Sequence, residues 1–241
     1  MCPSGLIMQM KMPNRTTDTE PDDRYPVSYS TSHKRNSPMK ILAFGAHPDD
    51  LEIGMGGTIA RHISRGHEVL MVVATVPNRK EIRIPEAEQA AAILGAELIV
   101  MDMPPDELVF SREMVRQFDQ IFKEYRPDIV YTHSNNDSHQ DHNAVTNAVI
   151  ATTRKNDCSL YMYEQTIPGG IAPLPFRGQY FIDISETIEP KLESIMAHKS
   201  QLDTYGPWWL EGIKGRASYH GFQVNTKYAE VFEVVKHLAK W

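Results

Sequence analysis

The sequence predicts a single α/β domain with a Rossmann-like parallel sheet flanked by helices. The chain has 241 residues, which is enough for one sizeable hydrophobic core. Hydrophobic residues make up 41% of it and charged residues 23%, as in an ordinary soluble globular protein. The decisive observation is that short, continuous apolar runs alternate with longer helical patterns, which predicts βαβ units and a parallel sheet.

The first four strands are expected where apolar runs are rich in β-branched residues: 40–45, 68–75, 97–101 and 128–132. Helical patterns accompany them at 56–65, 85–95, 111–125 and 141–153. The pattern at 85–95 has Pro first and Gly last, as helix ends prefer. These elements predict a strand order of about 3-2-1-4-5. Ligands in such sheets bind at the carboxyl ends of the strands.

The two ends of the chain differ in pattern. Residues 1–38 are rich in Pro, Ser, Thr and Asn without periodicity, so we expect a disordered or loosely packed tail before a domain over 39–241. Further strands are expected at 159–164 and 179–183 and a helix at 186–201. A loop lying over the sheet is expected at 202–226 and a C-terminal helix at 227–239.

Composition excludes several classes of function. The net charge of −6 gives no basic footprint for nucleic acid and no polybasic strip for a membrane surface. The chain has two cysteines, Cys2 and Cys158, which predicts a reducing compartment rather than a disulfide framework. No apolar run approaches the ~20 residues of a membrane helix. We therefore expect a cytoplasmic protein without membrane or nucleic-acid partners.

The first functional motif, Ala-His-Pro-Asp-Asp, follows the strand at 40–45 directly. Imidazole and carboxylate are good zinc ligands, and a tight turn can aim His47 and Asp50 at one point. Pro48 restricts the backbone of that turn. Asp49 is then expected to point elsewhere, beside the metal, where a general base belongs.

The motif allows two other interpretations. Asp49 or Asp50 could simply cap the next helix, because Asp favours that position. The following Gly-Met-Gly-Gly run is a poor match to a dinucleotide fingerprint, since it lacks G-x-G-x-x-G and follows two carboxylates that would repel a pyrophosphate. Its glycines are better explained by a close approach of helix and sheet.

The second motif, His139-Gln-Asp-His142, follows the strand at 128–132 and opens a helix. Two His three residues apart share a helix face, so one can bind metal while the other lies beside the reacting group. Asp141 can accept a hydrogen bond from an imidazole and so fix its tautomer. If the two strands are neighbours, the motifs meet. Three protein ligands and an open position form a catalytic zinc site.

With these motifs the sequence resembles the LmbE-like (PIG-L) family of zinc-dependent deacetylases. The helix with Arg83-x-x-Glu86, the later Ala-His198-Lys-Ser-Gln segment and Tyr228-Ala-Glu-x-Phe232 add to the resemblance, which spans about 39–238. Members remove the N-acetyl group of N-acetylglucosamine carried by inositol, phosphatidylinositol, malate, another sugar or an antibiotic scaffold. The resemblance implies a small N-acetylated sugar as substrate and a homo-oligomer, either a trimer or a hexamer.

The resemblance also implies roles for individual residues. The metal ligands are His47, Asp50 and His142, with zinc as the cofactor and Fe(II) or Co(II) as substitutes. Asp49 is the general base, and His139 stabilises the oxyanion with Asp141 behind it.

Substrate contacts are open to more than one interpretation. Arg83 could hold a phosphate, a carboxylate or hydroxyls, or lie on the surface. His198 could face the pocket from its helix. Trp208 and Trp209 could stack on a sugar or pack internally, and His133 could support the metal ligands from behind.

Three rival functions remain at this point. A phosphoesterase could use the same ligands, but would want a second metal and more carboxylates. Two His and one carboxylate also suit Fe(II) oxygen chemistry, although the adjacent Asp49 favours hydrolysis. A catalytically silent sugar-binding homologue is the non-enzyme alternative, which the intact Asp49, His139 and Asp141 disfavour.

Overall fold

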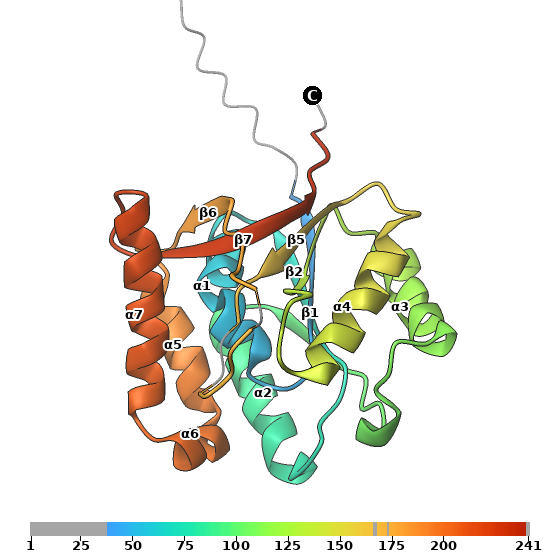
Figure 1. Cartoon of the computed structure of the whole chain (residues 1–241), viewed down its shortest axis with the longest axis horizontal. Helices are drawn as coiled ribbons and strands as arrows, with labels where there is room; N and C mark the ends of the chain where they lie inside the picture. Colours follow the sequence, from blue (N-terminus) through green and yellow to red (C-terminus); the bar gives the residue numbers. More distant parts are fainter. Residues whose placement is uncertain (1–37, 166–167, 173, 240–241) are drawn as a thin grey trace, which may run out of the picture. The chain divides into compact units, whose positions relative to one another are not determined.

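The computed structural model describes residues 38–165, 168–172 and 174–239. Its sheet has seven strands in the order β3-β2-β1-β4-β5-β7-β6 (Figure 1). The first five are parallel, and β7 is antiparallel to both β5 and β6. The strands are β1 (Lys40–Gly45), β2 (Glu68–Val73), β3 (Glu97–Val100), β4 (Ile129–His133), β5 (Ser159–Tyr163), β6 (Tyr180–Asp183) and β7 (Ala229–Lys236).

Helices cover both faces of the sheet. One face carries α3 (Arg112–Tyr125) and α4 (Gln140–Thr153), and the other carries α1 (Asp50–Ser64) and α2 (Lys80–Leu94). Against α1 and α2 packs α5 (Ile188–Ala197), followed by α6 (Lys199–Tyr205) and α7 (Trp208–Gln223). A short 3₁₀ helix spans Pro105–Glu107.

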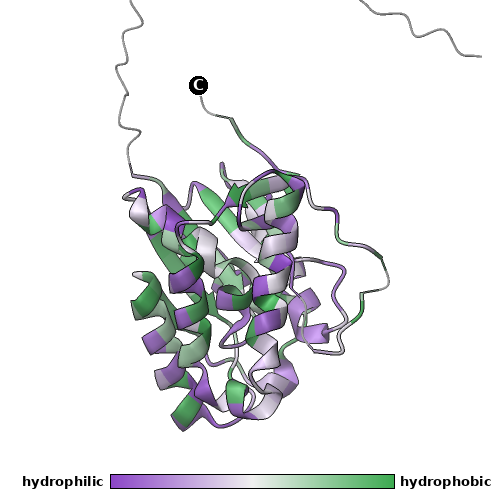
Figure 2. Cartoon of the chain, turned by 90° about the vertical axis from the view of Figure 1, so that its left-hand side faces the viewer, coloured by the Kyte–Doolittle hydropathy of each residue, from purple (hydrophilic) through white to green (hydrophobic). Residues whose placement is uncertain are grey.

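Strand β1 shows how the sequence specifies two cores. Its alternate residues Leu42 and Phe44 pack with α3 and α4, while Ile41 and Ala43 pack with α1 and α2. All four are fully buried, as expected for a central parallel strand covered on both faces. Figure 2 shows hydrophobic and hydrophilic residues alternating along the outer helices, which bury one side only.

The predicted fold class and the order of the first five strands are confirmed. Two predictions in the C-terminal third are wrong. The expected helix at 227–239 is strand β7, whose first five residues are all buried and so lack the alternation of a half-exposed strand. The expected loop at 202–226 contains the end of α6 and all of α7. That helix buries only Trp209, Ile213, Ala217 and Gly221, a stripe too narrow to give strong periodicity.

The expected tail at 1–38 lies, apart from Pro38, outside the described residues. Within the described part of the chain, no helix is both long and apolar enough to cross a membrane.

The glycines of the Gly-Met-Gly-Gly run bring α1 close to its neighbours, as the sequence suggested. A Cβ on Gly54 would lie 2.3 Å from the ring of Tyr163 in β5, and one on Gly57 would lie 2.7 Å from Ile184. These contacts set how closely the helix that begins at Asp50 approaches the sheet.

Substituting Gly54→Ala should therefore lower the free energy of unfolding by roughly 1–3 kcal/mol through overpacking. Gly212→Ala in α7 is the matched control, because an added Cβ meets nothing within 4 Å among the described residues. That control should be neutral or stabilising by up to about 1 kcal/mol, since alanine favours helix. Urea unfolding of both variants measures the difference, and equal effects would contradict the close approach.

Candidate metal and catalytic site

The site begins with a strained turn between β1 and α1. Asp49 adopts a left-handed backbone (φ 96°, ψ −25°), which is rare for a residue other than glycine. The turn is closed by Asp50, whose Oδ2 accepts a hydrogen bond of 2.7 Å from the backbone N–H of His47. Asp50 is 2% exposed and is the first residue of α1. The turn therefore points the two carboxylates in different directions.

The second half of the site comes from the segment between β4 and α4. Because β1 and β4 are parallel neighbours in the sheet, the segments that follow them meet at its carboxyl edge. His139 is the N-cap of α4, and Asp141 and His142 lie in its first turn. The two motifs that the sequence singled out are thus brought together.

The three predicted metal ligands converge. One ligand atom from each of His47, Asp50 and His142 lies within 4.8 Å of the others. Asp50 is central: its Oδ1 is 3.4 Å from Nε2 of His142, and its Oδ2 is 3.5 Å from Nδ1 of His47. A single cation between these atoms would replace the contacts that they now make with one another.

The outer nitrogen of each imidazole is held by a further carboxylate. Nε2 of His47 is 2.9 Å from Asp141 Oδ2, and Nδ1 of His142 is 2.8 Å from Asp137 Oδ2. Metal-binding His side chains commonly carry such a carboxylate, which fixes the tautomer and leaves the inner nitrogen free to bind. The residues present therefore fit a divalent metal with two imidazoles and one carboxylate.

Gln165 and His133 also contact the Asp50 carboxylate, and Nε2 of His133 lies 3.3 Å from Asp50 Oδ2. Gln165 donates from Nε2 to Asp50 Oδ1 at 2.5 Å. His133 is fully buried, accepts the backbone N–H of Ala46 at Nε2 (2.9 Å), and stacks on His142 with ring centroids 4.0 Å apart. His133 therefore supports the site from behind, as one interpretation of the sequence suggested.

Surrounding carboxylates change the proton affinity of the two ligand imidazoles. Burial lowers the pKa of His47, but its hydrogen bonds to Asp141 and Asp50 outweigh burial and raise it to about 9. Burial also opposes a proton on His142, yet the charge of Asp50 and the bond to Asp137 raise its pKa to about 10. Without metal, both rings carry the positive charge that a cation would supply.

Asp49 is available as a base. Its side chain makes no capping hydrogen bond to an amide of the described chain, so the capping interpretation fails. Burial, followed by the charge of Asp50, raises its pKa to about 7. A carboxylate with a pKa near the working pH can both accept and return a proton.

His139 is held as a neutral donor. Its Nδ1 accepts the backbone N–H of Asp141 at 3.2 Å, which leaves the proton of a neutral ring on Nε2. Burial and the nearby His142 and His47 lower its pKa. The expectation that the Asp141 carboxylate stands behind His139 needs correction, because that carboxylate bonds to His47 and only the backbone of Asp141 contacts His139.

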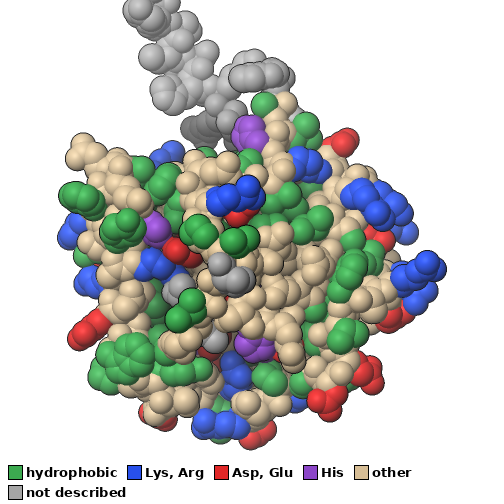
Figure 3. All heavy atoms as spheres, viewed as in Figure 1, with side chains coloured by type: hydrophobic (Ala, Val, Ile, Leu, Met, Phe, Trp, Pro, Cys, Tyr) green, Lys and Arg blue, Asp and Glu red, His purple; other side chains and the backbone are tan. Residues whose placement is uncertain are grey.

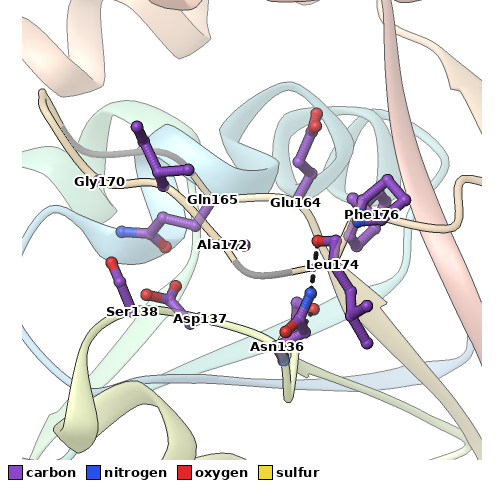
Figure 4. Close-up of a pocket in the computed structure, with 12 residues that line it drawn as sticks. Asn136, Asp137, Ser138, Glu164, Gln165, Gly170, Ala172, Leu174 and Phe176 are labelled. Carbon is purple, nitrogen blue, oxygen red and sulfur yellow. Dashed lines mark hydrogen bonds between the residues drawn. The ribbon is translucent and has the colours of Figure 1, made fainter.

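A pocket of about 490 Å³ opens onto these residues. Its walls combine the strained turn with polar side chains from two other segments: Asn78, Arg79, Arg83, Gln201, Thr204, Tyr205 and Trp209. In the space-filling view, a histidine and a basic side chain lie together in a hollow in the lower half of the molecule (Figure 3). An adjoining pocket of about 290 Å³ includes Asp137, Ser138 and Gln165 in its lining (Figure 4).

The two predicted substrate contacts differ in outcome. Arg83 lines the pocket but is 6% exposed, and it donates to the backbone oxygen of Pro48 at 2.9 Å while lying 3.6 Å from Asp49. It thus supports the strained turn. His198 is fully buried, and its Nε2 lies 3.3 Å from the Glu52 carboxylate. It is not among the described residues that line the pocket, so the expectation that it contacts the substrate from its helix is wrong.

Asp137 and Gln165 were missed by sequence reasoning. Each lies in a segment between elements, where no periodicity marks it. The available signal for Asp137 was its position two residues before the helix cap, where its Oδ1 accepts the His139 amide at 2.8 Å. Nothing local marks Gln165, which follows β5 and reaches the site only through the sheet.

Comparison with known proteins places the chain in a family. The model of the PIG-L family, described as GlcNAc-PI de-N-acetylase, matches residues 42–153. An uncharacterized deacetylase of Escherichia coli, YaiS, is 32% identical over 71% of this chain and 95% of its own length. The chain belongs to the PIG-L (LmbE-like) deacetylase family.

Other similar proteins cover most of the chain. The diacetylchitobiose deacetylase of Thermococcus kodakarensis is 26% identical over 85% of this chain and 86% of its own. The crystal structure of the conserved protein TT1542 from Thermus thermophilus superposes with a TM-score of 0.74 at 25% identity, covering 84% of this chain and 97% of that one. The relatives thus match the domain and not only its motifs.

Metal binding should release protons. Zinc needs neutral imidazoles, whereas His47 and His142, with pKa values raised to about 9 and 10, carry protons at pH 7. Binding at pH 7 should therefore displace about two protons per chain, and affinity should rise with pH until both rings are neutral. Calorimetric zinc titration in buffers of different ionisation enthalpy measures this number. Binding without proton release would show that the rings are neutral beforehand.

Proposed function

We propose that this protein is a zinc-dependent deacetylase that hydrolyses the N-acetyl group of an N-acetylglucosamine-type sugar. The observation that carries the proposal is the convergence of His47, Asp50 and His142 beside a base, Asp49, whose carboxylate is not used as a cap. Family membership supports the same reaction. Zinc is favoured by two imidazoles and one carboxylate with a position left for substrate or water.

Zinc bound at this site would polarise the acetyl carbonyl and acidify the attacking water. The chain's own residues handle the protons. The Asp49 carboxylate accepts one proton from the water while the water oxygen attacks the carbonyl carbon. Its pKa, raised to about 7, suits both this step and the return of the proton to the leaving amine. The products are acetate and a free amino group.

His139 has a separate task at the carbonyl oxygen. Because the Asp141 amide occupies Nδ1, the Nε2–H of His139 is the donor that can stabilise the developing oxyanion. One such preorganised donor contributes roughly 3–4 kcal/mol in comparable sites. The Asp141 carboxylate acts instead through His47, whose ring it orients.

The substrate class is proposed from the pocket and the relatives. The pocket holds about 490 Å³ and is lined by amide, hydroxyl and guanidinium groups, which suit the hydroxyls of a sugar. Tyr205 and Trp209, with ring centroids 5.5 Å apart, add aromatic surface to one wall. The Thermococcus relative is named for an acetylated amino-sugar disaccharide, which favours the same class here.

A second metal is not required by this geometry. The other two clusters of potential ligands among the described residues share His47 or His142 with the proposed site. They therefore compete for the same side chains, which disfavours a two-metal phosphoesterase.

Asp49→Asn and Asp50→Asn should fail in different ways. Asp49→Asn keeps the size of the side chain but cannot accept the proton from water, so zinc should stay bound while kcat falls by roughly 10²–10⁴. Asp50→Asn removes the charge of a ligand, so zinc affinity should fall and excess zinc should restore part of the activity. Metal content and turnover of an N-acetylated sugar are measured for both variants at the same zinc concentration.

The pair of variants contains its own control, because the two residues are adjacent and undergo the same substitution. Asp49→Asn with the turnover of the wild type would overturn the proposed mechanism. Equal loss of zinc in both variants would mean that Asp49 is a ligand rather than the base.

A further inference from the structure

Helix α1 is broken at Met55, one turn after the strained turn between β1 and α1. Met55 has φ −150° and ψ 21°, which is not helical. In an unbroken helix, the carbonyl groups of Glu52 and Ile53 would accept from the N–H groups four residues later. Here the buried ammonium of Lys191 from α5 donates to both carbonyls, at 2.9 and 2.8 Å.

The other side of the break is closed by Glu230 from β7. Its Oε1 accepts the N–H of Gly57 at 3.1 Å, and its Oε2 accepts the N–H of Thr58 at 2.7 Å. Glu230 also pairs with Lys191 at 2.6 Å. One ion pair thus terminates the first piece of the helix and starts the second, with α5 and β7 both packed on α1 (Figure 1).

The signs of the charges fit the two helix ends. A helix favours a cation at its C-terminus and an anion at its N-terminus. Lys191 lies at the C-terminal end of the first piece, and Glu230 lies at the N-terminal end of the second. Arg216 from α7 adds a second cation at the first end by donating to the Ile53 carbonyl at 2.8 Å.

The first piece of α1 is the part that carries the site. It begins at the ligand Asp50 and is one turn long, so it has little stability of its own. Its N-terminal end follows the strained Asp49, and its C-terminal end is held by Lys191 and Arg216. The directions of both carboxylates therefore depend on how the C-terminal end is fixed.

We propose that the Lys191–Glu230 pair positions the metal-binding turn, acting through the first turn of α1 on Asp49 and Asp50. This inference rests on the proposed function, because the turn is the one assigned to the metal and the base. Lys191 and Glu230 are 1% and 5% exposed. A buried pair of this kind is weak evidence for stability, since apolar residues of similar volume often stabilise a fold as well. Apolar residues could not hydrogen-bond to the backbone on either side of the break, as Lys191 and Glu230 do, and so could not orient the turn in this way.

The test uses the full-length chain with Lys191→Met/Glu230→Gln, which removes both charges of the pair together. We expect it to fold, to bind Zn²⁺ at least tenfold more weakly in calorimetric titration, and to lose at least tenfold in kcat with little change in KM. Hydrogen exchange of the metal-free protein should be faster at the amides of residues 51–54. Lys191→Arg, which keeps the charge, should give a smaller loss of zinc affinity and thereby a partial rescue.

Phe118→Leu is the control for lost stability alone, because Phe118 is buried on the opposite face of the sheet. It should lower Tm without changing zinc affinity, kcat or exchange at residues 51–54. Should the double variant fail to fold, Glu230→Gln alone decides, because its amide keeps the size of the side chain but has one oxygen to accept the N–H groups of Gly57 and Thr58 where the carboxylate has two: wild-type zinc affinity and exchange in that variant would then overturn the proposal.

Three results separate this inference from the proposed function. Wild-type zinc affinity and exchange in a folded double variant overturn the positioning role. A wild-type protein that binds zinc but deacetylates no N-acetylated sugar overturns the proposed function, and the affinity comparison still tests the pair. If the wild type binds no zinc, exchange at residues 51–54 still decides whether the pair holds the turn.

Discussion

The strained turn from His47 to Asp50 is the constraint on which the rest of the site depends. Asp49 is held in a left-handed conformation that costs roughly 1–3 kcal/mol and persists only if its surroundings determine it. Three features fix this conformation. Asp50 accepts a hydrogen bond from the His47 N–H, and Arg83 donates one to the Pro48 carbonyl. The turn also directly follows β1, which lies in the middle of the sheet. Because the turn is fixed in this way, adjacent carboxylates can take opposite roles, one as ligand and one as base.

Crowded negative charge is the second feature that organises the site. Asp50 is buried, and its pKa is well below its ordinary value because, against the effect of burial, the His142 imidazole stabilises its charge. The pKa of Asp49 moves the other way, since burial and the neighbouring Asp50 both disfavour a second anion. The same arrangement thus keeps the proposed ligand charged and brings the pKa of the proposed base near 7, which is the separation that acid–base catalysis needs.

Sequence reasoning succeeded where local pattern and topology coincide. The parallel order of β1 to β5 follows from βαβ alternation, and it places His47 and His142 together before any side chain is known. The predictions fail at β7, because its first five residues are all buried and the alternation of a strand is lost. They also fail at α7, because a buried stripe of only four residues gives weak helical periodicity. His198 was misplaced for a related reason: α5 ends at Ala197 and α6 begins at Lys199, so His198 lies at a break and turns inward to Glu52. Asp137 and Gln165 act through the fold rather than through a motif, and their sequence neighbours could not reveal them.

The later motifs of the chain have a common physical role in the structure. Glu86 accepts two hydrogen bonds from Ser200, at 2.8 Å from its N–H and 2.6 Å from its hydroxyl, and so ties α2 to α6. His198 and Lys191 contact the first turn of α1 at Glu52, while Glu230 holds the turn after the break. Residues from α5, from the junction of α5 and α6 and from β7 therefore converge on the two pieces of α1 on either side of its break rather than on the pocket. Since a single turn has little helical stability of its own, the proposed positioning of the metal-binding motif depends on these buried polar contacts from the rest of the domain.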